Sequence, residues 1–227
     1  MAANNGGDKG TRNLVIVMVS FIVVVGVVFS LISNRSSTTA AIPASVSADD
    51  GYGIVLNPNT KPTIDVYVDY QCPACRAFEI INGGYLNEVI AQNKAKVVFH
   101  PMTFIGPESI LAANAAACAA DENEFMAMNL ALFQDQSAEE NSGKWQGDAL
   151  LNIGKSIGIN SAKFETCIKD GSYVNWTGNV ATATAKADVN GTPTIFVNGK
   201  ELDRSKENNE YGDPVKFRAA LAAGGVK

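Results

Sequence analysis

The longest apolar segment of the chain lies close to its start. Residues 14–32 are nineteen consecutive positions without a charged side chain, which is long enough to cross a bilayer as a helix. Lys9 and Arg12 precede this segment and Arg35 follows it, so the excess of positive charge predicts a cytoplasmic N-terminus. The alternative is a signal peptide that is cleaved near residues 46–48. Both interpretations place the rest of the chain outside the cytoplasm.

Strand and helix patterns alternate after this segment. Residues 33–50 are rich in serine, threonine and alanine and have no periodicity, so they are predicted to form a tether. A β-branched and aromatic stretch at 63–70 predicts a strand, and a second strand is predicted at 96–100. The helix between them, beginning after Cys72, is expected to break at 82–84 and then to resume. This order predicts a parallel strand pair with a right-handed crossover.

The middle of the chain has only helical patterns. The predicted helices are 109–121, 124–133, 148–157, 161–169 and 172–188. Residues 191–197 return to a strand pattern, and Asn198-Gly199 predicts a tight hairpin leading to a short strand at 200–202. A final helix should begin after Asp213 as its N-cap. The chain is therefore predicted to be an α/β sheet interrupted by a helical block.

Composition and charge exclude some classes of function. The 227 residues carry a formal net charge of −5, and no basic stripe is present, so a nucleic acid is not an expected partner. The four cysteines are an even number on the exported side of the chain, which suits an oxidising compartment.

The motif Cys72-Pro73-Ala74-Cys75 carries the chemistry. Pro73 fits the first position of a helix, which makes Cys72 the N-cap residue. Its sulfur then faces free backbone N–H groups and the positive end of the helix dipole. A thiolate is stabilised there and its pKa falls, so the motif predicts thiol redox chemistry.

Two other interpretations of this cysteine pair need no redox activity. A structural disulfide across one helical turn would stabilise the fold little through loop entropy. A zinc site would need two further ligands from Cys118, Cys167 and the single histidine, His100.

Together these motifs resemble the DsbA-like thiol–disulfide oxidoreductases. The strand that ends in Asp69-Tyr70-Gln71 before the cysteine motif, the helical insertion and the later Gly191-Thr192-Pro193-Thr194 strand carry the resemblance. It implies a thioredoxin fold in two parts, residues 51–106 and 191–227, with an all-helical domain inserted at 107–190. One transmembrane anchor at 14–32 would precede the fold, after a cytoplasmic tail at 1–13 and before the linker at 33–50.

The resemblance also implies roles for individual residues. Cys72 would be the exposed attacking sulfur and Cys75 the resolving thiol, with Pro73 and Ala74 as the dipeptide between them. Pro193 would be a cis-proline facing the disulfide, and the backbone at Thr192 would pair with a substrate peptide. The thiols would need no cofactor and no metal.

Two positions depart from the family pattern. Well-studied members have histidine before the second cysteine, where this chain has Ala74, so a milder oxidant is expected. Relatives often bury an acid six residues before the first cysteine, where this chain has Val66. Strand alternation turns Asp65 and Asp69 to the opposite face, so the acid that would exchange a proton with Cys75 is not identified by the sequence.

Cys118 and Cys167 lie in separate predicted helices of the insertion. Relatives often pair their insertion cysteines, so the resemblance together with an oxidising compartment implies a structural disulfide. Two buried free thiols, or a second redox-active pair, are the alternatives.

The resulting functional hypothesis is a membrane-tethered, extracytoplasmic enzyme of bacterial type. It would donate the Cys72–Cys75 disulfide to cysteine pairs of exported polypeptides. A membrane quinone-linked enzyme, DsbB-like or vitamin K epoxide reductase-like, would reoxidise it. A reductase or isomerase, for example in cytochrome c maturation, and a non-catalytic thioredoxin-like binding module are the alternatives.

Overall fold

Strand β2 (Thr63–Val68) forms the middle of the sheet. The computed structural model describes residues 40–205 and 207–227, and in this part the sheet has five strands in the order β1-β3-β2-β4-β5. The outer strands are β1 (Ile54–Leu56) and β5 (Lys200–Glu201). The inner neighbours of β2 are β3 (Lys96–Pro101) and β4 (Thr194–Val197).

The predicted parallel pair is confirmed. β2 runs parallel to β3, with Val66 opposite Phe99, and helix α2 connects the two strands. β4 pairs antiparallel with the other edge of β2. β1 pairs antiparallel with β3 and was not predicted, because three residues are too few to display an alternating pattern.

The predicted break in the first helix is wrong. α2 (Pro73–Ala91) continues through Gly83 and Gly84. The carboxyl of Glu79 lies where a Cβ at position 83 would have to stand, so glycine allows a close approach here. Asn82 is also held, because its side-chain amide donates to the Tyr211 carbonyl over 2.7 Å. The glycine pair therefore serves packing and does not end the helix.

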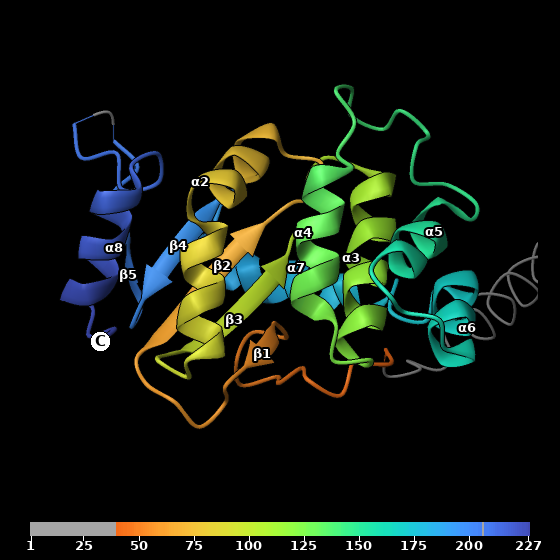
Figure 1. Ribbon diagram of the computed structural model, residues 1–227, viewed down its shortest axis with the longest axis horizontal. Coiled ribbons are helices and arrows are strands. Elements are labelled where there is room, and N and C mark those ends of the chain that lie inside the picture. Colours follow the sequence, from red (N-terminus) through yellow and green to blue (C-terminus); the bar gives the residue numbers. More distant parts are fainter. Residues whose placement is uncertain (1–39, 206) are drawn as a thin grey trace, which may run out of the picture. The chain divides into compact units, whose positions relative to one another are not determined.

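The helical block lies between β3 and β4 in the chain (Figure 1). It consists of α3 (Pro107–Ala120), α4 (Phe125–Gln134), α5 (Ala149–Ser156), α6 (Ala162–Asp170) and α7 (Trp176–Lys186). α3 contacts each of the other four helices, and its alanine-rich sequence allows this close packing. α7 begins four residues later than predicted, at the fully buried Trp176.

The end of the chain follows the prediction. Asn198 and Gly199 both have positive φ, 50° and 77°, as a tight hairpin between β4 and β5 requires. Asp213 caps α8 (Pro214–Ala223) by accepting from the N–H groups of Val215 and Lys216. α8 packs against α2, where Phe217 meets the ring of Phe78 edge to face.

Residues 41–227 form one compact unit, and the preceding unit, 1–40, lies almost entirely outside the described residues. The predicted anchor at 14–32 falls there. Of the predicted linker, residues 40–50 are described; Val46 bridges to Ile54 and packs against the core. None of the helices in 40–205 and 207–227 has the length and apolar character needed to cross a membrane.

Candidate active site

The two cysteines of the motif occupy different environments. Cys72 is the N-cap of α2, with extended backbone angles, and Pro73 stands in the first turn. Its sulfur is partly exposed and lies 3.4 Å from the carbonyl oxygen of Thr192. Cys75 is fully buried on the inner face of the same helix. Both thiols are free in this structure.

The environment of Cys72 stabilises its thiolate. Its pKa is lowered to about 6, first because the Cys75 thiol donates a hydrogen bond to it. The side chain of Thr192 and the backbone N–H groups of Cys75 and Ala74 lower it further, while partial burial opposes them. The free N–H groups of the first helical turn are the donors that the N-cap position supplies.

The environment of Cys75 has the opposite effect. Burial is the largest cause that raises its pKa, far above that of an ordinary thiol. The hydrogen bond to Cys72 and the negative charge on that sulfur act in the same direction. At neutral pH the pair therefore holds one reactive thiolate at the surface and one protonated thiol beneath it.

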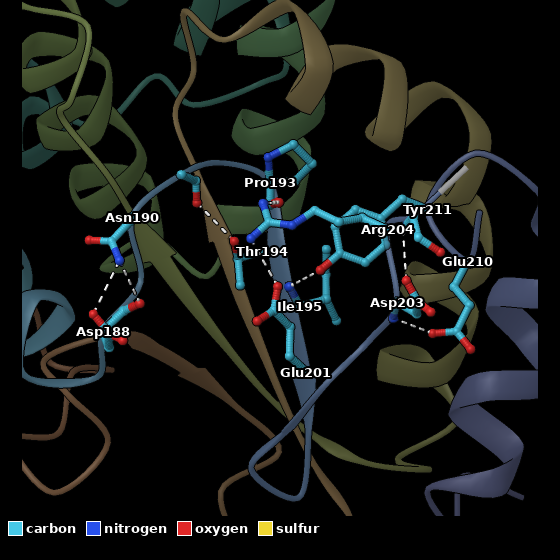
Figure 2. A network of polar contacts seen from close by, with 12 residues as sticks. Asp188, Asn190, Pro193, Thr194, Ile195, Glu201, Asp203, Arg204, Glu210 and Tyr211 are labelled. Carbon is cyan, nitrogen blue, oxygen red and sulfur yellow. Dashed lines mark hydrogen bonds and ion pairs between the residues drawn. The ribbon is translucent and has the colours of Figure 1, made fainter. Parts of the chain in front are cut away.

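The Thr192–Pro193 peptide bond is cis and brings the start of β4 against Cys72. Figure 2 shows how the segments after β4 hold this strand. Arg204 donates to the Pro193 carbonyl over 3.3 Å and pairs with Glu201 over 2.9 Å. The N–H of Ile195 donates to the Tyr211 hydroxyl over 2.8 Å. Arg204 and Tyr211 follow Pro193 by 11 and 18 positions, and no sequence pattern marks them.

The helical insertion also contacts the cysteine loop. Gln136, just after α4, donates its side-chain amide to the carbonyls of Tyr70 and Cys72, over 2.7 and 3.1 Å. Gln71 donates to Ser109 Oγ over 2.9 Å, and its own amide oxygen accepts from the N–H of Asn141 over 2.6 Å. These contacts fix the backbone on which Cys72 stands, and the sequence did not indicate them.

The structure contains a disulfide between Cys118 and Cys167, with the two Cα atoms 5.9 Å apart. It joins α3 to α6, so neither cysteine can serve as a zinc ligand. His100 stacks on Tyr67, and its Nε2 pairs with Asp65 Oδ1 over 3.1 Å. Within residues 40–205 and 207–227, no three His, Cys, Asp or Glu side chains are grouped in a way that could hold a metal ion.

A family model described as thioredoxin matches residues 51–216. The chain belongs to the thioredoxin family. This thioredoxin-family protein is similar to the solved structure of MdbA from Actinomyces oris, a thiol-disulfide oxidoreductase, with a TM-score of 0.68. The two are 22% identical, and the match covers 80% of this chain and 92% of MdbA.

DsbA from Mycobacterium tuberculosis, in its reduced form, has the same fold with a TM-score of 0.57 and 24% identity. That match covers 81% of this thioredoxin-family chain and 96% of DsbA. These likenesses and the family match confirm the predicted thioredoxin-like α/β fold with its helical elements.

A curated protein, the Na(+)/H(+) antiporter NhaA 3 of Salinispora tropica, is 25% identical over 162 residues. The match covers 70% of this thioredoxin-family chain but only 24% of the antiporter. The likeness thus concerns a small part of that protein.

Proposed function

We propose that this protein is a thiol–disulfide oxidoreductase that oxidises cysteine pairs of exported polypeptides. The observation that carries the proposal is the contrast between the two thiols, with Cys72 at a pKa of about 6 and Cys75 buried and protonated. Exchange chemistry needs a sulfur that leaves readily and remains accessible, and Cys72 meets both conditions.

The reaction follows from the positions of the two sulfurs. In the oxidised enzyme a substrate thiolate attacks Cys72 Sγ, the Cys72–Cys75 bond breaks, and Cys75 leaves with the electron pair. A second substrate thiolate then attacks the substrate sulfur of the mixed disulfide and expels Cys72 as a thiolate. The substrate loses two electrons and the enzyme gains them. The carbonyl of Thr192 lies beside Cys72 Sγ, and the substrate peptide would pair with this backbone as an added strand.

The depressed pKa of Cys72 supports donation of the disulfide over its reduction. A stabilised Cys72 thiolate stabilises the reduced enzyme, so the disulfide form is the stronger oxidant. An equilibrium titration against glutathione measures this directly. We expect a potential well above the roughly −270 mV of thioredoxin, towards the roughly −120 mV of strong oxidants. A Cys72–Cys75 disulfide that persists in excess reduced glutathione would contradict disulfide donation and favour a reductase.

Two substitutions test the assigned roles in the same assay. Cys72→Ser should abolish exchange, whereas Cys75→Ser should accumulate mixed disulfides through Cys72, because the enzyme then has no second thiol of its own to displace the partner. Oxidase activity that survives Cys72→Ser would contradict an enzymatic role for the motif and favour a binding module.

We also propose that residues 14–32 tether the enzyme to the cell membrane with its catalytic part outside the cytoplasm. The charge-free apolar run and the flanking positive charges support this. A quinone-linked membrane enzyme, DsbB-like or vitamin K epoxide reductase-like, would reoxidise Cys72 and Cys75. Alkaline extraction of membranes and protease treatment of intact cells test the tether. Full-length protein that leaves the membrane fraction at high pH would contradict it.

A further inference from the structure

Six large apolar side chains are exposed in residues 40–205 and 207–227, and three of them lie on two neighbouring helices. Ile80 and Ile81 belong to α2, and Leu130 belongs to α4, which packs beside α2 (Figure 1). Ile80 is 72% exposed and Leu130 is 39% exposed. Single exposed apolar side chains are common on soluble proteins, whereas a group of them on one face marks an interaction surface.

The two helices form a groove of about 420 Å³ between them. Ile80 and Leu130 both line this α2–α4 groove, together with the buried ring of Phe133. The other lining residues are Arg76, Glu79, Gly83, Gly84, Asn87 and Gln134. A concave site with apolar walls and a few polar groups accepts a side chain of a partner, whereas a bilayer surface binds apolar faces that protrude.

Gly84 leaves one side of the groove open. The carboxyl of Glu79 explains the glycine at 83, but no atom stands within 4 Å of the position of a Cβ at Gly84. Gly84 is exposed and its φ is not positive, and glycine inside a helix weakens it relative to alanine. Nothing in the described part of the chain therefore requires glycine here. Its missing side chain gives an outside group access to Ile80 and Leu130.

The groove begins one helical turn from the reactive thiol. Arg76 lines it, and the N–H of Arg76 donates to the Cys72 carbonyl over 3.1 Å. Ile80 stands eight positions after Cys72, which is about 12 Å along a helix. An extended peptide spans that distance in about four residues. A polypeptide whose cysteine reacts with Cys72 can therefore place a nearby side chain in the groove.

We propose that the α2–α4 groove binds an apolar side chain of the polypeptide that exchanges with Cys72, about four residues from the reacting cysteine. This inference rests on the proposed function, because only an exchanging polypeptide would bring a residue there. Arg76 is the exposed charge beside the groove, so the bound segment is uncharged or acidic. Unfolded polypeptides expose apolar side chains that folded ones bury, so the groove favours substrates that have not yet folded.

The test compares two peptides with the detergent-solubilised full chain. Each peptide carries one cysteine as a mixed disulfide with thionitrobenzoate, and either leucine or serine stands four residues before and four residues after it. Cys72 of the reduced enzyme attacks the peptide sulfur and expels thionitrobenzoate, whose absorbance gives the second-order rate constant. We expect the leucine peptide to react at least about fivefold faster, because burial of its side chain stabilises the complex.

Two groove variants should remove this preference for leucine. Ile80→Ser combined with Leu130→Ser removes the apolar walls. Gly84→Leu fills the groove instead, and since leucine stabilises a helix relative to glycine, unfolding would not explain its effect. Val215→Ser is the matched control, because Val215 on α8 is 73% exposed but does not line the groove. Oxidised glutathione has no apolar side chain of this kind and should react equally with all of these proteins.

A preference for leucine that persists in both groove variants overturns the inference, and so does a wild type that reacts equally with the two peptides. A wild type that sediments as a dimer in detergent, and as a monomer with Ile80→Ser, would assign the groove to a second copy of the chain and also overturn it. A wild type that reacts with neither peptide nor with oxidised glutathione contradicts the proposed function itself.

Discussion

At the scale of single residues, Cys72 and Cys75 lie only three positions apart, yet the first is stabilised as a thiolate and the second stays protonated. Cys72 stands at the helix start, where N–H groups point outward, and Cys75 points into the core. The Cys75 thiol donates to Cys72, so each sulfur strengthens the preference of the other. The reactivity of the pair is thus a property of its placement at the helix N-terminus.

A substitution at Ala74 tests how far the pKa of Cys72 can be lowered at the helix N-terminus. Ala74→His should lower the pKa of Cys72 below about 6, because an imidazolium beside the sulfur favours the thiolate. Each unit by which the pKa of Cys72 falls stabilises the thiolate by about 1.4 kcal/mol. This raises the reduction potential of the disulfide by about 30 mV. Ultraviolet titration of the thiolate and a glutathione equilibrium measure both quantities.

Ala77→His is the control for this substitution, since Ala77 is exposed on the same helix about one turn further on. Its effect on the Cys72 pKa should be much smaller, because the distance to the sulfur is greater. Equal shifts in the two variants would show that charge on the helix, and not its place beside Cys72, controls the potential.

The sequence predicted the cysteine pair, its proline and Pro193 because each belongs to a local motif. It did not predict that Glu79 is buried, because the position of a glutamate along a helix does not show by itself whether its side chain is buried. Arg204 and Gln136 reach the site from segments that only the tertiary fold brings near. The helix break predicted at 82–84 is wrong, because the carboxyl of Glu79 packs where a side chain at position 83 would stand.

At the scale of elements, the insertion does more than cover the sheet. Gln136, beyond the end of α4, donates to two carbonyls of the cysteine loop. Gln71 donates its side-chain amide to Ser109 Oγ and Asn141 Oδ1 of the insertion and accepts from the backbone N–H of Asn141. The thioredoxin-like part therefore receives its loop geometry from the helical part.

Gln136→Ala tests this coupling. It removes the donor to the Tyr70 and Cys72 carbonyls, which should cost about 1–3 kcal/mol in the free energy of unfolding. The loop should also loosen, so that exchange with oxidised glutathione slows. Urea unfolding and stopped-flow kinetics measure the two effects. Gln134→Ala, at the exposed end of α4, is the control, and matching losses in both variants would contradict a specific role for Gln136.

The Cys118–Cys167 disulfide also connects elements, because it joins α3 to α6 across 49 positions of the sequence. Replacing both cysteines, Cys118→Ala with Cys167→Ala, should lower the free energy of unfolding by up to about 4 kcal/mol in the chain-entropy model. Exchange by Cys72 should survive, because neither cysteine belongs to the thiol site. A double variant that is stable but inactive would instead indicate a second redox pair.

At the scale of the whole molecule, the pKa of Cys72 links redox state to stability. The folded value of about 6 lies below the roughly 8.5 of an unfolded thiol. A depressed pKa contributes stability that is fully present above the unfolded value and is lost as pH falls through the folded one. The reduced protein should therefore gain stability, relative to the oxidised one, as pH rises from about 6 to about 8.5.

Comparing the two redox forms isolates this effect, because Glu79 and Asp69 are present in both. Urea unfolding of each form across that pH range should give a stability difference whose slope stays below about 1.4 kcal/mol per pH unit, since Cys72 is partly exposed and solvent screens it. Below pH 6 the slope should vanish. Reduced Cys72→Ser should lack this rise, because Cys75 stays protonated in the folded state; its ionisation in the unfolded state near pH 8.5 can only lower stability. A slope that persists in this variant would assign the linkage to another group and remove the stability argument for disulfide donation.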